Sequence, residues 1–254
     1  MKKPLIFKAV TLFLISTISF YSCGNDDEPQ EPTVDPNAII EFTDPNFKAA
    51  LLEHGKTIIS IKGDIDIIDT NSDGEIQVKE ALAYTKSIAV SGNNLSDLKG
   101  IEFFKNISKL DAGNNSLDKI DLSHNTELVV LSLYKNQLSK LDISKNINLT
   151  NLNVFENQLT QLDVSNNKKL NYLSAYNNLL EGYFNLANNN NLTYLSLSEN
   201  RLNNLNLANG NNESLNTMGA NSNPNLICIQ IDTDFTPPIN WKKDDIADYS
   251  DNCQ

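Results

Sequence analysis

The chain of 254 residues has little positive charge, few histidines and no apolar stretch long enough to span a bilayer. Its 20 Lys and Arg residues stand against 32 Asp and Glu residues, a formal charge of -12. Nucleic-acid binders need clustered cations that release counterions from phosphates, so we expect no nucleic-acid partner. With only two histidines and no nucleophile motif, the chain is not expected to be an enzyme. Apolar residues make up 40% of it, which is enough for a folded core.

The apolar run that does occur is short and lies near the beginning, where Lys2 and Lys3 precede residues 9–20. A transmembrane helix needs about 20 apolar residues, whereas a signal peptide needs about 7 to 15. The run is followed by Ser22 and Cys23, as at the cleavage site of bacterial lipoproteins. This resemblance predicts a lipoprotein signal peptide over residues 1–22 and lipidation of Cys23. The alternative is cleavage after Ser19 by an ordinary signal peptidase.

The residues after Cys23 are acidic and poor in apolar side chains. The run at residues 26–28, DDE, resembles the export signal of surface lipoproteins in Bacteroidota. That resemblance implies an outer-membrane lipoprotein that is exposed at the cell surface and held by its lipid alone. A periplasmic or a secreted protein remains the alternative. The composition predicts a flexible acidic tether over residues 23–42.

A small helical cap is expected over residues 43–84. Asp44 is a good N-cap and Pro45 suits the first helical position, while Phe47 and Leu51 would share one face. Gly55 is suited to end the helix.

Residues 69–80, DTNSDGEIQVKE, match the calcium loop of an EF-hand. That loop type supplies side-chain and carbonyl oxygens at fixed positions, with a glycine at the sharp turn. The expected ligands are Asp69, Asn71, Asp73, Glu75 through its carbonyl, and Glu80. The preceding residues suit extended chain and the following VKEALAYT suits a helix, so we predict a solitary loop holding one structural calcium ion. An acidic turn without an ion is the alternative.

An internal repeat is the strongest signal in the sequence. The pattern LxxLxLxxNxL recurs every 21–23 residues, and its fourth position is occupied by Ile88, Leu110, Leu131, Leu152, Leu173, Leu195 and Met218. The first, fourth and sixth positions cannot be buried within one unit, so the units must stack and their strands must pair. This predicts a leucine-rich-repeat solenoid over residues 85–225, with a parallel β-sheet on its concave face and turns or short strands on its convex face.

The ninth position of the repeat is asparagine in every unit. Its amide can donate to and accept from backbone groups that the turn leaves unpaired. The residues concerned are Asn93, Asn115, Asn136, Asn157, Asn178, Asn200 and Asn223.

The second half of each unit, as in LDVSNN, makes the chain resemble the internalin-type leucine-rich repeats of bacterial surface proteins. The end of the chain resembles the cap of flavobacterial repeat proteins, which implies a C-terminal cap over residues 226–254. NPNLICIQID would form a final strand with Cys228 on the concave face. If Cys23 carries a lipid, Cys228 and Cys253 most simply form one disulfide, with two free thiols as the alternative.

The third and seventh positions of the repeat point away from the core and carry aromatic rings in neighbouring units. Strands lie about 4.8 Å apart, so such rings would stand in ladders. The predicted ligand-binding residues are Tyr134, Phe155 and Tyr176 at position seven and Tyr172 and Tyr194 at position three. Lys135, Glu156 and Glu199 would form a polar rim.

Clustered rings are typical of recognition surfaces. We therefore expect the chain to bind a protein through its concave face. The alternatives are a glycan bound by the same tyrosines, and a passive surface protein in which the rings only shield the sheet.

Overall fold

The structure is a computed structural model that describes residues 34–54 and 67–253. The predicted signal peptide, Cys23 and the first part of the predicted tether lie outside the described residues, as do Gly55 and most of the segment before the acidic loop.

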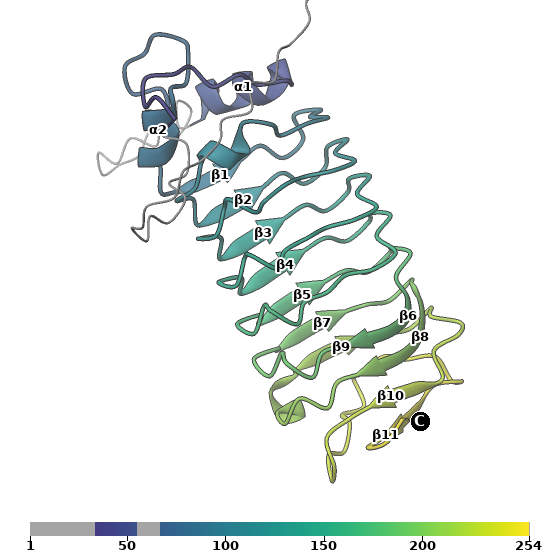
Figure 1. The fold of residues 1–254 in the computed structure, drawn as a ribbon. Helices are drawn as coiled ribbons and strands as arrows, with labels where there is room; N and C mark the ends of the chain where they lie inside the picture. Colours follow the sequence, from purple (N-terminus) through teal and green to yellow (C-terminus); the bar gives the residue numbers. More distant parts are fainter. Residues whose placement is uncertain (1–33, 55–66, 254) are drawn as a thin grey trace, which may run out of the picture. The chain divides into compact units, whose positions relative to one another are not determined.

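Seven short strands form one parallel sheet on the concave face (Figure 1). In spatial order they are β1 (Ser87–Ala89), β2 (Lys109–Asp111), β3 (Val130–Ser132), β4 (Asn151–Asn153), β5 (Tyr172–Ser174), β7 (Tyr194–Ser196) and β9 (Thr217–Gly219). Each strand pairs in register with the next, so that Leu131 lies between Leu110 and Leu152. The pairing aligns the fourth positions from Ile88 to Met218 as predicted, which confirms the leucine-rich-repeat solenoid.

The core consists of the leucines of the repeat. In the third unit Leu128, Leu131 and Leu133 are all fully buried, and the same positions are buried in the units on either side. Removing one such side chain from water contributes about 2 kcal/mol. Because these side chains meet between units rather than within one, the stack is stabilised as a whole.

Six of the seven predicted asparagines form a ladder that joins each unit to the one before it. Asn136 accepts a hydrogen bond from the Leu117 N–H at 3.0 Å and donates to the carbonyls of Ala112 and Leu133, both at 3.0 Å. Asn115, Asn157, Asn178, Asn200 and Asn223 repeat this arrangement. Asn93, in the first unit, differs: it is exposed, and its amide donates to the Ser91 carbonyl of its own turn.

A second asparagine ladder, which the sequence analysis missed, runs along the convex side. Its members are Asn125, Asn146, Asn167 and Asn189, all fully buried. The Asn146 amide donates to the carbonyls of Leu122 and Asn125 in the preceding unit, at 3.1 and 2.8 Å. Neighbouring units are therefore joined by side-chain hydrogen bonds on both sides of the core.

The recurring aspartates of the convex side stabilise turns. Asp121, Asp142 and Asp163 each accept the backbone N–H of the serine two residues later, at 2.8–2.9 Å. These hydrogen bonds hold the pKa of each carboxyl below its ordinary value. The LDIS and LDVS motifs thus recur because every unit needs the same turn.

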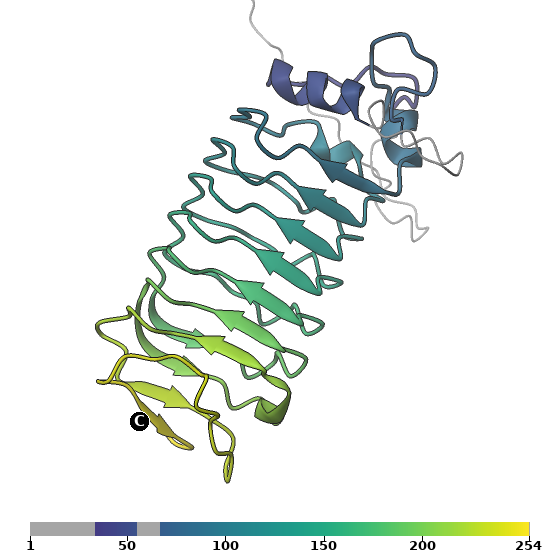
Figure 2. The same cartoon turned by 180° about the vertical axis from the view of Figure 1, so that it is seen from behind.

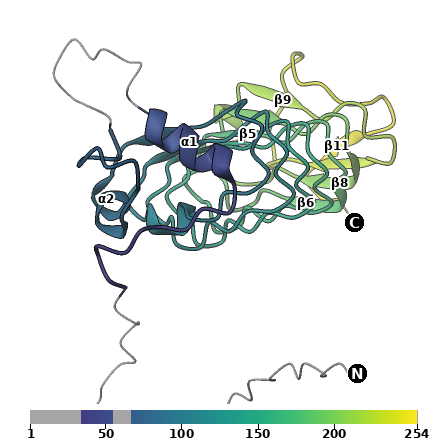
Figure 3. The ribbon, with the colours of Figure 1, turned by 90° about the horizontal axis from the view of Figure 1, so that it is seen from above.

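The later units have strands on the convex side as well. A parallel sheet in the order β11-β10-β8-β6 contains β6 (Glu181–Asn185), β8 (Arg201–Asn206), β10 (Cys228–Gln230) and β11 (Asp248–Ser250). Figure 3 shows β5 and β9 on one side of the coils and β6 and β8 on the other, and Figure 2 shows the C-terminal coils from behind.

The placement of Cys228 on the concave face was wrong. The strand predicted from NPNLICIQID exists as β10, but Ile229 pairs with Leu205 of β8, on the convex side. The physical reason is the repeat itself: Met218 of β9 already provides the fourth position of the last unit, so the residues after Asn223 form its returning half.

The N-terminal cap contains α1 (Pro45–Glu53) and α2 (Val78–Ala83). Asp44 is the N-cap of α1, and Phe47 and Leu51 are fully buried, as predicted. The Asp44 carboxylate also accepts hydrogen bonds from the backbone N–H and hydroxyl of Ser96 in the first unit, at 2.7 and 3.0 Å. One side chain thus caps the helix and joins it to the stack.

The C-terminal cap continues the hydrogen bonding of the repeats with other residues. Asp244 accepts the backbone N–H groups of Ser222 and Asn223 at 2.8 and 2.7 Å, where a further unit would supply backbone carbonyls. Trp241 is buried and donates its ring N–H to the Leu215 carbonyl at 3.0 Å. The short 3-10 helices η1 (Ile101–Phe103) and η2 (Asn212–Ser214) lie in the returning halves of the first and sixth units.

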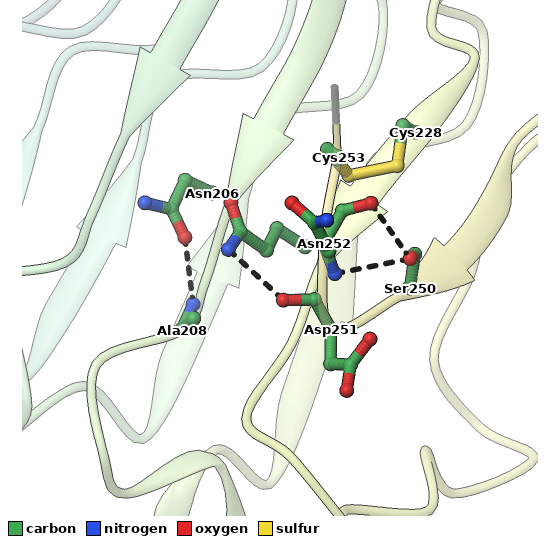
Figure 4. The surroundings of a disulfide bond; sticks show 8 residues. Asn206, Ala208, Cys228, Ser250, Asp251, Asn252 and Cys253 are labelled. Atoms are coloured by element: carbon green, nitrogen blue, oxygen red, sulfur yellow. Dashed lines mark hydrogen bonds between the residues drawn. A yellow bond between two sulfur atoms is a disulfide. The ribbon is translucent and has the colours of Figure 1, made fainter.

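A disulfide closes this cap. Cys228 of β10 is bonded to Cys253, just after β11, with the two Cα atoms 5.9 Å apart (Figure 4). The predicted pairing is confirmed.

Candidate binding face

Two ladders of aromatic rings stand on the concave face. Phe155 stacks on Tyr134 with ring centroids 5.0 Å apart and on Tyr176 at 4.7 Å. Tyr172 and Tyr194 stack at 4.5 Å. Interplanar angles of 7–15° mean that the rings are nearly parallel. The structure brings all five predicted residues together in the two columns that the repeat implies.

The ladders follow from strand register. Tyr172 and Tyr194 are direct partners in the pairing of β5 with β7, and parallel strands hold equivalent side chains at one strand spacing, about 4.8 Å. A ring on every strand at one position therefore has a neighbouring ring as its nearest contact. The column between the ladders carries small side chains, which leaves the rings as the largest groups on this face: Ser132, Asn153, Ser174, Ser196 and Gly219.

The longer ladder ends at Tyr134, whose outer face lies against Gly113, a residue that sequence reasoning missed. A Cβ atom at this position would overlap the Tyr134 ring. The ring thus lies against the Gly113 backbone, and the Tyr134 hydroxyl reaches the Ser91 hydroxyl at 3.0 Å. Glycine at position seven, next to an aromatic residue at position seven of the following unit, is the signal that could have revealed this contact.

A polar edge accompanies the ladder. The Tyr176 hydroxyl donates to the Glu156 carboxylate at 3.5 Å, and the Lys135 ammonium lies 3.9 Å from the same carboxylate. Burial raises the pKa of the Tyr176 hydroxyl, and the nearby Glu156 charge raises it further. Burial also raises the pKa of the Tyr172 hydroxyl. Both phenols therefore stay protonated at neutral pH and remain able to donate.

All five rings are only half-buried, although their faces cover one another. The rings thus cover one another's faces and still remain partly exposed to solvent. Edge-on rings offer a broad contact area, whereas a sugar ring stacks on an aromatic face. In this arrangement the inner faces are covered by neighbouring rings, and the outer face of Tyr134 lies against the Gly113 backbone.

The acidic loop has the turn geometry of its motif. Gly74 has φ +81°, a conformation that glycine adopts easily, and α2 follows the loop as expected. The Asp69 carboxylate accepts the Gly74 N–H at 3.0 Å, and the Glu80 carboxylate accepts the N–H groups of Thr70 and Gln77 at 2.8 and 3.0 Å. Asp69 and Glu80 are buried although acidic.

The loop is also paired, but not with a second loop. Ile39 and Gln77 form an antiparallel bridge, and the Ile40 N–H donates to the Ile76 carbonyl at 2.9 Å. Residues 38–40 therefore support the loop from outside the motif.

The donor set of the loop suits a hard cation, because all five predicted ligands offer oxygen. The Asn71 amide nitrogen, however, donates to the Asp73 and Gln77 side chains at 2.9 and 3.0 Å, so that its nitrogen rather than its oxygen faces them. Among residues 34–54 and 67–253, no three His, Cys, Asp or Glu side chains converge closely enough to hold a metal ion. Binding would require the Asn71 side chain to rotate and the carboxylates to draw together.

The two histidines lie in different environments. His54 contacts the Ser87 carbonyl through a ring nitrogen at 2.8 Å, and His124 is exposed beside a convex turn.

Within the described part of the chain, no helix is both long and apolar enough to cross a membrane.

Comparisons with known proteins support the fold. No family profile matches the sequence, and no curated protein sequence matches it. Among solved structures, the chain is similar to the functional domain of InlJ from Listeria monocytogenes, which includes a cysteine ladder, with 26% identity over 69% of this chain and a TM-score of 0.53. The chain spans only 42% of that domain. It is also similar to internalin C2 from Listeria monocytogenes, with 20% identity over 76% of this chain and 88% of the other, and a TM-score of 0.52. The repeat architecture is thus of the internalin type.

Proposed function

We propose that this protein is a non-enzymatic binding protein of the bacterial cell surface that recognises a protein partner through the two ring ladders of its concave face. The observation that carries the proposal is the pair of half-exposed ladders formed by Tyr134, Phe155 and Tyr176 and by Tyr172 and Tyr194. Rings contribute large contact area at a small cost in side-chain entropy, and tyrosine adds a hydroxyl for hydrogen bonding.

Protein is favoured over glycan because of how the rings lie. Stacked rings present edges and hydroxyls along the ladder, which suits the broad and varied surface of a folded protein. A sugar chain would need free ring faces in a row, and each inner face is covered by the next ring.

The test is capture of a partner from native cell envelopes with the mature protein and two double variants, Tyr134→Ala with Tyr176→Ala, and Tyr172→Ala with Tyr194→Ala. We expect one protein to be captured by the wild type and lost with either variant. The matched control is Tyr183→Ala, which removes an exposed tyrosine from the convex side. A glycan array that binds the wild type and neither double variant would instead assign the ladders to a glycan.

The localisation belongs to the same proposal. We place the chain in the outer membrane through a lipid on Cys23, with the residues between Cys23 and Ala38 as a tether. The end of the predicted tether, residues 38–42, instead packs on the core through Ala38, Ile40 and Phe42. The support is the signal-peptide pattern and the acidic run that follows it. A Cys23→Ala variant should leave the membrane fraction and appear in the soluble fraction. Unchanged membrane association of this variant would contradict the anchor.

We further propose that residues 69–80 hold one structural calcium ion. The support is the match of the motif, the turn at Gly74 and the burial of the Asp69 and Glu80 carboxylates. Hydrogen bonds from neutral groups alone poorly compensate the cost of burying these two negative charges. Such an ion would stabilise the cap and take no part in recognition.

A further inference from the structure

A cavity of about 660 Å³ opens on the convex side, away from the ring ladders. It lies where the convex side changes from turns to strands. The Glu181 N–H still donates to the Thr160 carbonyl at 3.2 Å. A bulge between Gly182 and Tyr183 then shifts the register of β6, and bulges commonly re-aim a side chain. The cavity lies between residues 160–163 of one unit and 180–184 of the next.

The side chains around this cavity depart from the repeat. Tyr183 is 57% exposed, the most exposed ring among the large apolar side chains of the described residues. Arg201 is the single arginine of the chain. It lies beside Glu181 in the pairing of β6 with β8, yet no ion pair joins the two in the described part of the structure. An arginine and a carboxylate on adjacent strands thus both remain available to a ligand.

The lining supplies donors and acceptors together. Arg201, Asn203 and Asn225 can donate, while Asp163 and Glu181 can accept, and Tyr183 adds a ring face and a hydroxyl. Two carboxylates against one guanidinium disfavour an anionic ligand, and the guanidinium disfavours a cation. The mainly polar lining disfavours an apolar ligand. What remains is a neutral molecule rich in hydroxyl groups with one apolar face.

We infer that this cavity binds a neutral oligosaccharide, with a sugar ring stacked on Tyr183 and its hydroxyls bound by Arg201, Glu181 and Asp163. A sugar hydroxyl donates to a carboxylate and accepts from a guanidinium. Glu181 and Arg201 are not paired with each other, and the Asp163 carboxylate, which accepts the Ser165 N–H at 2.8 Å, has lone pairs left for a hydroxyl. The cavity volume lies within the range of about 300–1,000 Å³ that small-ligand sites occupy. This cavity is separate from the concave face, and a protein bound to the concave face would leave the cavity open.

The experiment is a titration of the mature protein with neutral trisaccharides (maltotriose, cellotriose, mannotriose and xylotriose) and with trigalacturonic acid, followed by saturation-transfer NMR and calorimetry up to about 5 mM. We expect at least one neutral trisaccharide to bind and the galacturonic acid trimer not to bind. Tyr183→Ala and Arg201→Ala should each weaken that binding by about tenfold or more.

Two controls keep the outcome clear. Tyr134→Ala changes a tyrosine on the concave face and should leave sugar binding unchanged, and thermal melts should show that Tyr183→Ala and Arg201→Ala remain folded. The inference is overturned if no neutral trisaccharide binds, if only the acidic one binds, or if binding is lost with Tyr134→Ala but kept with Tyr183→Ala. Because the ring ladders take no part in this assay, its failure would leave the proposed protein-binding face untouched.

Discussion

Gly113 determines how the longer ring ladder ends, because only a missing side chain lets the Tyr134 ring lie against the backbone. Gly113→Ala should displace that ring and break its contact with Ser91. Overpacking of this kind costs about 1–3 kcal/mol. Urea denaturation would measure the loss, and partner capture should weaken in parallel.

The matched control for this variant is Gly219→Ala, also on the concave face. There the added Cβ would meet the Ser198 hydroxyl at 3.0 Å and the Ser196 hydroxyl at 3.9 Å, and a hydroxyl can rotate away. If both alanine variants lose the same stability, then the contact between Gly113 and Tyr134 has no special role.

Single residues were predictable where the repeat fixes their direction and not where a contact spans two units. The five rings and the asparagines at position nine follow from counting along LxxLxLxxNxL. Gly113 has no pattern of its own, since its meaning depends on the size of Tyr134 in the next unit. The second asparagine ladder was visible as the recurring Asn of SxN, with Ala187 in place of serine before Asn189. A buried amide cannot, however, be told from an exposed one in a polar turn.

The N-terminal helix is joined to the repeats by the Asp44 carboxylate, and its attachment should depend on pH. Hydrogen bonds from Ser96, Asn46 and Asp97 outweigh the effect of burial and hold the Asp44 pKa below its ordinary value of 3.8. A depressed pKa contributes stability that is fully present above 3.8 and is lost as the pH falls through the lower value of the folded state. Acid should therefore loosen the cap.

Asp44→Asn separates charge from capping, because asparagine is also a good N-cap. We expect the wild type to lose protection of α1 amides below about pH 4, whereas the variant should be less stable at pH 7 and change less with acid. Hydrogen exchange of residues 45–53 across pH 3–7 would check this. Equal pH dependence in both proteins would contradict the role of Asp44.

The calcium loop can be tested without any partner. Calcium should raise the melting temperature of the wild type, by the equivalent of about 2.7 kcal/mol at a hundredfold excess over Kd. The double variant Asp69→Ala with Glu80→Ala should show no such rise. A control with Asp121→Ala removes an acid from a convex turn and should keep the calcium effect. Equal melting temperatures of the wild type in calcium and in chelator would contradict the proposed calcium site.

Most helices and strands could be predicted from the sequence, and the exception is the sheet to which β10 belongs. The α1 helix follows from Asp44, Pro45 and the apolar spacing, and each strand of the concave sheet follows from the leucine pattern. The final strand was identified but placed in the wrong sheet, because Cys-Ile-Gln alternates as a concave strand does. Ile229 lies 11 residues after Met218, and Leu205 of the convex sheet lies 10 residues after Leu195. The spacing within the unit therefore indicated that the strand of Ile229 lies on the convex side.

The repeats form a stack in which every unit contacts only its neighbours, so the two ends of the stack decide how it unfolds. The disulfide spans 25 residues at the C-terminal end. A cross-link of this kind contributes about 2–4 kcal/mol, chiefly by restricting the unfolded chain. Reduction, or Cys228→Ser with Cys253→Ser, should destabilise the protein by this amount and expose the amides of β10 and β11 first.

Urea denaturation with and without a reducing agent would measure this effect. The double serine variant serves as its own control, since a reducing agent should not change it further. If the reduced wild type is as stable as the oxidised protein, the cap is held by Trp241 and Asp244 alone.

The central claim is that the ring ladders of the concave face contact a protein partner. The most direct measurement places a photo-crosslinking amino acid at Asn153, between the ladders, or at Lys145 on the convex side, and irradiates living cells. A discrete protein adduct at position 153, absent at position 145 and lost when Tyr134 and Tyr176 are alanine, is the predicted result. Adducts at position 145 alone, or none at position 153, would contradict the account.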